Sequence, residues 1–242
     1  MRLALALPAS RPRSFRQDAL ACTDNLRPFF KVFNAENIPG CGPCLITVNH
    51  YSKPGFQAWW LALSVNRIIP QEIHWVMTAA WTFPGRGAWS HSLVWLSKQI
   101  FRKVAVVYGF STMPPMPPDP LEVNGRANAV RQVLKVARSK PDVWIGIAPE
   151  GRDAPGGVLQ MPPPGTGRFL FLLAQAGLSF LPVGFYEDES GICLSFGKPY
   201  CLPVESSLTP AERDWRTSQT VMRQIAALLP SDLQGEFARE SC

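Results

Sequence analysis

Ile-Thr-Val-Asn-His-Tyr-Ser, residues 46–52, is the segment around which the rest of the chain is organised. The apolar run Leu45 to Val48 is typical of a buried strand. It ends in polar residues, and Lys53-Pro54-Gly55 then has the composition of a turn. A histidine at the exit of a buried strand, here His50, is held by a rigid element and can face a pocket. An imidazole titrates near neutral pH, so His50 is a candidate general base, with a purely structural histidine as the alternative.

The composition indicates a folded protein with a sizeable core. The chain has 242 residues, of which 46% are hydrophobic and 17% charged, which excludes a disordered chain. No change in composition divides it, so we expect a single domain. The formal net charge of +6 comes from scattered basic residues, so nucleic acid is not an expected partner. A mildly basic chain with eight tryptophans fits an anionic membrane surface or an anionic substrate better.

The sequence predicts a cytoplasmic protein that associates peripherally with a membrane. No stretch of 18 apolar residues is free of charges and helix breakers, so no membrane-spanning helix is expected. The apolar run at residues 3–7 is too short for a secretory signal, and the six cysteines are therefore interpreted as reduced thiols.

Cys41-Gly42-Pro43-Cys44 has the spacing of a thioredoxin-like redox motif. That chemistry needs the first cysteine at the start of a helix, where the helix dipole lowers its pKa. Because this motif leads into the strand at 45–48, we interpret Gly42-Pro43 as the turn that starts the strand.

The periodicity predicts an α/β fold with a mixed, mostly parallel sheet and flanking helices. Residues 14–38 are expected to form a helix and a strand-like segment, and the proline-rich segment 111–120 is expected to be irregular. Further strands are expected at 45–48, 73–77, 103–108, 143–148, 180–185 and 192–196, and further helices at 57–68, 128–139, 168–176 and 209–229. Loops that leave the carboxyl ends of parallel strands meet at one edge of a sheet, so the loops holding His50 and Glu150 are expected to converge.

Residues 80–100 are rich in tryptophan, interleaved with Gly, Pro and Arg. Amphipathic aromatic side chains beside cations suit the lipid headgroup region. A core helix with a few exposed aromatic side chains is the alternative.

The order of the motifs along the chain is informative. Asn49-His50-Tyr51-Ser52 follows one strand, and about a hundred residues later Pro149-Glu150-Gly151-Arg152 follows another. A helix and then the strand that holds Pro182 come next. This order resembles the glycerolipid acyltransferase superfamily, the glycerol-3-phosphate and 1-acylglycerol-3-phosphate (lysophosphatidate) O-acyltransferases, over roughly residues 35 to 203.

The resemblance implies an acyltransferase-like domain at 35–203, between an N-terminal helical segment at 1–34 and a C-terminal helical tail at 204–242. It also implies an enzyme of lipid metabolism and phospholipid biosynthesis that works at a membrane surface. His50 would be the general base that deprotonates an acceptor hydroxyl, which then attacks an acyl thioester, either acyl-CoA or acyl-carrier protein. The acceptor would be a lysophospholipid or a glycerol-phosphate-like alcohol. Substrate-binding residues would be Asn49, Ser52, Glu150, Gly151, Arg152, Arg126 and Pro182, with no bound cofactor.

The sequence departs from the family pattern at several positions. In the family, four residues separate the His from an Asp that is expected to orient the imidazole. That Asp falls at Gly55 here, and Glu72, Glu150 and Asp153 are candidate substitutes. The family's arginine near 108–110 is also missing, and Arg126 could supply that charge. These departures leave a second hypothesis open, a lipid-binding relative that has lost turnover. No metal site is expected, because His50, His74 and His91 lack ligand spacing with cysteines or acids.

Overall fold

A computed structural model describes residues 11–26, 28–53, 58–81, 89–115, 123–203 and 208–238. Within them, seven strands form one sheet in the order β1-β7-β6-β2-β5-β3-β4. The strands are β1 Phe30–Phe33, β2 Cys44–Val48, β3 Ile73–Thr78, β4 Ser111–Met113, β5 Trp144–Ile147, β6 Ser179–Asp188 and β7 Gly191–Phe196. All neighbours pair in parallel except the hairpin β6–β7. The predicted mixed, mostly parallel α/β fold is confirmed.

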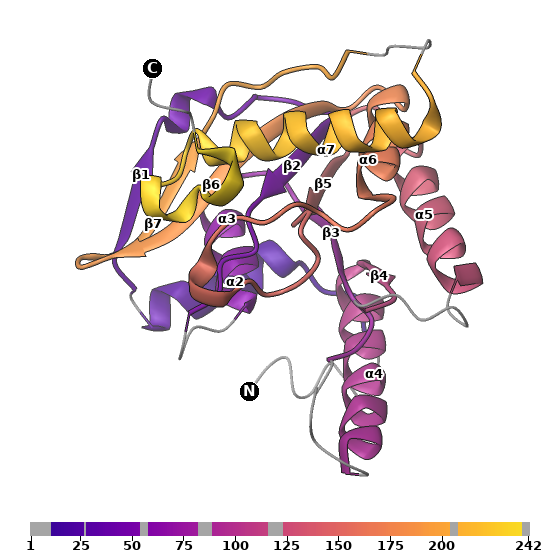
Figure 1. Cartoon of the computed structure of the whole chain (residues 1–242). Coiled ribbons are helices and arrows are strands. Elements are labelled where there is room, and N and C mark those ends of the chain that lie inside the picture. The colour runs from indigo at the N-terminus through magenta and orange to yellow at the C-terminus, as the bar shows by residue number, and fades with distance from the viewer. Residues whose placement is uncertain are drawn as a thin grey trace.

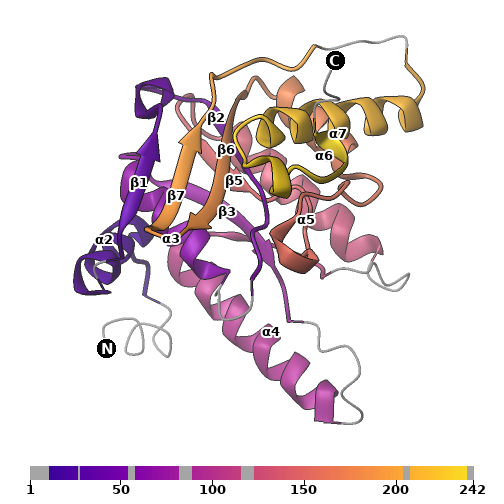
Figure 2. The ribbon, with the colours of Figure 1, turned by 60° about the vertical axis from the view of Figure 1, so that its left-hand side comes forward.

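Helices cover both faces of this sheet (Figures 1 and 2). The helices are α2 Phe15–Leu26, α3 Trp59–Ile68, α4 Trp89–Tyr108, α5 Val123–Ala137, α6 Thr166–Gln175 and α7 Pro210–Ala226, with short 3-10 turns at Ala35–Asn37, Pro155–Gly157, Ser231–Leu233 and Gly235–Phe237. Successive strand residues point to opposite faces, so Leu45 packs with α6 and α7, whereas Ile46 packs with α3. All five residues of β2 are buried, which explains its continuous apolar sequence.

Two predicted elements are wrong. Residues 103–108 were expected to form a strand because of their valines, but they are the last turns of α4. The same residues also have a helical spacing, because Phe101, Val104 and Tyr108 follow one another at intervals of three and four. Packing of these side chains on one side of a helix overrides the strand propensity of the valines. Residues 111–113, expected to be irregular, form β4 beside β3, because the prolines that block pairing begin only at Pro114. The rest of that segment, 116–122, lies outside the described residues.

Cys41-Gly42-Pro43-Cys44 leads directly into β2, as expected. Cys44 is the first residue of the strand and is fully buried, and burial raises the pKa of its thiol to about 12. A thiol that resists deprotonation is a poor nucleophile, which agrees with a structural interpretation of the motif.

Candidate active site

The register of two central strands brings distant parts of the chain together. Strands β2 and β5 are parallel neighbours, and Thr47 lies opposite Ile147. His50 lies three residues after Thr47, and Glu150 lies three residues after Ile147. The two residues are therefore at the same level beyond the carboxyl ends of β2 and β5. The backbone N–H of His50 donates a hydrogen bond to Glu150 Oε2 over 2.6 Å.

Glu150 holds the two loops in place. Its side chain is buried, with 2% of the residue exposed. One carboxylate oxygen accepts from His50 N and the other accepts from Gln160 N at 3.0 Å. Burial raises the pKa of Glu150, although both backbone hydrogen bonds act in the opposite direction. Glu150 therefore acts on the backbone of His50 and leaves the imidazole ring for another partner.

Asp153 is that partner. Its Oδ1 lies 3.1 Å from Nδ1 of His50. Nδ1 has no partner in hydrogen-bonding geometry among the described residues, so the contact with Asp153 is a close polar contact rather than an aligned hydrogen bond. The Asp153 side chain is 70% exposed, and the contact with His50 lowers the pKa of its carboxyl group. Of the three acids considered as substitutes, Glu72 instead accepts from the Ser14 hydroxyl. Gly55 lies outside the described residues.

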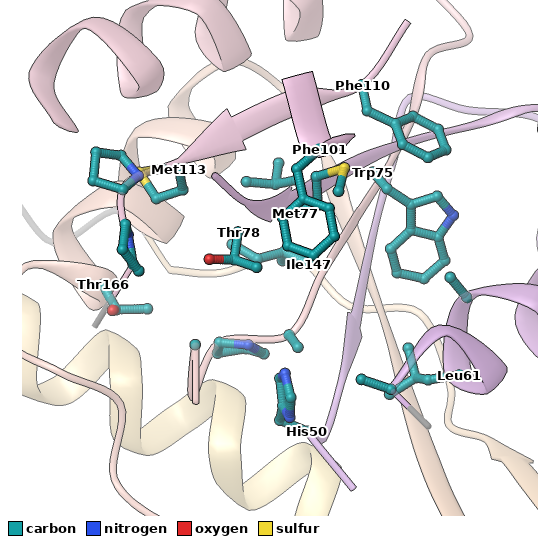
Figure 3. Close-up of a pocket in the computed structure, with 18 of the residues that line it drawn as sticks. His50, Leu61, Trp75, Met77, Thr78, Phe101, Phe110, Met113, Ile147 and Thr166 are labelled. Carbon is teal, nitrogen blue, oxygen red and sulfur yellow. The ribbon is translucent and has the colours of Figure 1, made fainter. Parts of the chain in front are cut away.

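His50 borders a cavity of about 550 Å³, a volume typical of small-molecule sites. Figure 3 shows His50 set apart from a group of apolar side chains that line the same cavity. One apolar wall comes from β3, α4, β4 and the segment between the last two, with Trp75, Met77, Phe101, Val104, Phe110 and Met113. A long apolar chain can therefore lie beside the histidine with much of its surface removed from water.

A glycine makes room for one wall of this cavity. A Cβ atom on Gly146 in β5 would come within 2.6 Å of the Trp75 indole ring. Trp75, in the neighbouring strand β3, therefore packs directly against the β5 backbone, and a larger residue at position 146 would displace it.

The other predicted substrate-binding residues divide into two groups. Ser52, Gly151 and Arg126 line the cavity together with His50. The Arg126 guanidinium also donates to the carbonyl oxygens of Pro114 and Pro115, at 3.3 and 3.2 Å. This arginine is thus held at the cavity wall by the segment that follows β4.

The remaining predicted residues are not part of the cavity lining. Asn49 is buried, and its side-chain amide exchanges two hydrogen bonds with the backbone of Phe185, at 2.8 and 2.7 Å, which ties β2 to β6. Pro182 lies within β6, where its carbonyl accepts from Gly197 N. The exposed Arg152 donates to Gln160 Oε1 at 3.3 Å.

The start of α6 also borders the cavity, through residues 163–166. The N–H groups of Gly165 and Arg168 donate to the Asp214 carboxylate of α7, at 2.8 and 2.7 Å. An aspartate at this position satisfies N–H groups that a helix start leaves unpaired and complements the helix dipole. A Cβ atom on Gly167 would lie 1.9 Å from the Asp214 carbonyl oxygen, so glycine is needed for this close packing.

Two further observations concern the described residues only. They contain no group of three or more potential metal ligands. None of their helices combines the length and the apolar character needed to span a membrane.

The apolar wall of the cavity was not identified from the sequence. Phe101 and Val104 reach it because α4 continues through residues 103–108, which were interpreted as a strand. Their spacing with Ser97 and Tyr108 on one side of a helix is the signal that could have identified this wall.

Comparison with known proteins agrees with this architecture. Among solved structures, the chain is similar to the crystal structure of the 1-acyl-sn-glycerophosphate (LPA) acyltransferase PlsC from Thermotoga maritima. The TM-score is 0.50 and the identity 14%, over 88% of this chain and 77% of that one. The fold is that of an acyltransferase. No family model matches the chain, and no curated protein matches it by sequence. At 14% identity the likeness establishes the fold, and the activity has to be argued from the site.

Proposed function

We propose that this protein is an O-acyltransferase that moves a fatty acyl group from an acyl thioester to a hydroxyl of a lysophospholipid or a glycerol-phosphate-like acceptor. The observation that carries the proposal is the position of His50, whose ring contacts Asp153 and whose residue borders a large apolar cavity. The donor is acyl-CoA or acyl-carrier protein. The acyltransferase fold and the order of the sequence motifs support the same activity.

The reaction needs one group that accepts a proton and later returns it. With Nδ1 facing Asp153, Nε2 of His50 takes the proton of the acceptor hydroxyl. The acceptor oxygen attacks the thioester carbonyl carbon and forms a tetrahedral intermediate. The C–S bond then breaks, and the imidazolium returns its proton to the leaving thiolate. Asp153 stabilises the imidazolium between these two steps.

The cavity separates the parts of the substrates by polarity. The fatty acyl chain lies among the apolar side chains from β3 and α4, where burial of each methylene group contributes about 0.8 kcal/mol. The polar part of the acceptor lies near Ser52, Gly151 and Arg126. An acceptor phosphate pairs with the Arg126 guanidinium, which carries a fixed positive charge at the wall.

Acyl transfer from a long-chain thioester to lysophosphatidate and to a panel of other alcohols tests the proposal. Purified wild-type protein is compared with His50→Ala, and both the released thiol and the ester product are measured. Because general-base catalysis contributes about 10²- to 10⁴-fold, we expect the rate to fall by about a thousandfold. His74→Gln is the matched control, because His74 does not line the cavity and contacts Ser111 at 2.9 Å. An unchanged rate in His50→Ala would refute the role of His50.

A lipid-binding protein without turnover is the second candidate. The exposure of Asp153 favours it, because a solvated carboxylate orients the imidazole less firmly than a buried one. Saturable binding of lysolipid, with no ester formed by either wild type or His50→Ala, would establish this function instead.

A further inference from the structure

Helix α4 is attached to the body of the protein at one end and projects beyond the sheet at the other (Figures 1 and 2). Its last turns are attached to the body: Arg13 N donates to Val107 O at 2.8 Å, and the Tyr108 ring packs on Phe15 with centroids 4.9 Å apart. Its first half extends away from the sheet in both views (Figures 1 and 2). A helix in this position exposes side chains that other helices bury.

The side chains exposed on α4 are largely apolar. Trp95 is 63% exposed, and Leu93, Leu96, Ile100 and Val106 are exposed as well. Their spacing places them on two adjacent stripes of the outer surface, one with Trp95 and Val106 and one with Leu93, Leu96 and Ile100. In water this surface is unfavourable, so it indicates a partner.

The charges on α4 identify the kind of partner. The helix contains the basic residues Lys98, Arg102 and Lys103 and no aspartate or glutamate. Arg102 falls on the same stripe as Trp95, and Lys103 follows Ile100 on the other stripe. Apolar side chains interleaved with cations complement an anionic lipid surface, where acyl chains and phosphate groups lie within a few ångströms of each other.

The inner side of α4 faces the cavity. Phe101 and Val104 line it, and Trp81 packs edge-on against Phe101 with centroids 4.9 Å apart. Trp81 and Trp59 also line the cavity while remaining about half exposed, which places them at its rim. A lipid surface that contacts the outer side of α4 therefore lies close to a route by which an acyl chain enters the cavity.

We propose that the outer surface of α4, formed by Leu93, Trp95, Leu96, Ile100, Arg102 and Lys103, docks the protein on an anionic lipid bilayer. The apolar side chains enter the boundary between headgroups and acyl chains, and the cations pair with lipid phosphates. The helix lies along the membrane with its inner side toward the cavity. Docking is independent of the proposed chemistry and is measured without any acyl donor.

Cosedimentation of the full chain with vesicles tests the proposal. We expect binding to vesicles of phosphatidylcholine and phosphatidylglycerol, weaker binding to phosphatidylcholine alone, and a loss of the difference at high salt. Trp95→Ala combined with Leu96→Ala should weaken partitioning by at least about tenfold on both vesicle types. Arg102→Gln combined with Lys103→Gln should weaken it by about thirtyfold on anionic vesicles only.

Trp215→Ala is the matched control, because Trp215 is 58% exposed on α7 and belongs to a different helix. We expect Trp215→Ala to change vesicle partitioning by less than about twofold. Thermal unfolding followed by circular dichroism should give every variant the melting temperature of the wild type. Absence of vesicle binding, or equal effects of Trp215→Ala and the α4 variants, overturns the proposal. So does a dimer in vesicle-free light scattering that the α4 variants dissociate, because a second copy would then cover this surface.

Discussion

Glu150 and Asp153 lie three residues apart in the loop after β5, yet they contact the same histidine in different ways. Glu150 is buried and binds the backbone N–H of His50, whereas Asp153 is mostly exposed and contacts the ring. Burial raises the pKa of the first carboxyl group, and the histidine lowers the pKa of the second. One loop therefore supplies two different contacts: Glu150 holds the backbone of His50, and Asp153 lies beside its ring.

The sharpest test of this division is Asp153→Asn. We expect kcat to fall by about a hundredfold, with KM and the melting temperature nearly unchanged. This loss is smaller than the roughly 10⁴-fold seen when the buried acid of a catalytic triad is replaced, because Asp153 is solvated. In steady-state assays, Asp153→Asn added to His50→Ala should have no further effect. A further loss in the double variant would mean that Asp153 acts through another group.

Glu150→Gln should show the opposite pattern, a loss of stability of about 2 kcal/mol. The amide keeps one acceptor oxygen and presents its NH₂ group to a backbone N–H, so one buried donor loses its partner. Urea unfolding measures the change. Glu36→Gln is the control, since Glu36 is exposed in the turn Ala35–Asn37 and its replacement should stay within about 0.5 kcal/mol. A stable Glu150→Gln protein would contradict the role assigned to the buried carboxylate.

Arg126 and Arg152 differ in the same way in their expected contact with the acceptor. Arg126→Gln should raise the KM for a phosphate-bearing acceptor by about tenfold, because Arg126 is a cation on the cavity wall. Arg152→Gln should change KM by less than about twofold, because Arg152 is not among the lining residues and contacts Gln160 instead. The reverse order of effects would place the acceptor on the exposed side of the loop.

The smallest expected effect is a difference in pH dependence. The raised pKa of Glu150 means that its contribution to stability is fully present below about pH 4.3 and is lost as pH rises through the folded-state pKa. Glu150→Gln should therefore cost more stability at pH 4 than at pH 7.

The pH dependence expected for Asp153 has the opposite sign, because its pKa is lowered. Its contribution to stability is present above about pH 3.9 and is lost as pH falls through the lower folded-state value. Asp153→Asn should cost less than about 1 kcal/mol at pH 7 and less still at pH 3.

Much of the fold was predictable because the central strands are continuous apolar runs bounded by turn residues. The convergence of the His50 and Glu150 loops also followed from the general rule that parallel strands present their carboxyl ends at one edge. The identity of the acid on the imidazole ring was not predictable. The sequence did not distinguish Glu72, Glu150 and Asp153 as partners of the imidazole. Only the tertiary arrangement places Asp153 Oδ1 near the ring.

The error at residues 103–108 has a physical cause that also affects the site. Valines at 104, 106 and 107 favour strands locally, but the position of a segment in the folded chain decides whether a branched side chain packs along a helix. The apolar wall of the cavity depends on that helix, so a local error about residues 103–108 also hid part of the candidate site.

The pairing of β2 has a consequence for synthesis on the ribosome. This strand lies between β5 and β6, whose first residues follow its own by 100 and 135 positions, with Cys44 opposite both Trp144 and Ser179. The N–H groups of Gly165 and Arg168 gain their Asp214 partner only after α7 has been synthesised. At a translation rate of about 5–20 residues per second, the nascent β2 therefore waits about 5 to 27 seconds before both neighbouring strands have been synthesised. During that interval the apolar residues of β2 stay exposed, so slower translation lengthens the time available for aggregation.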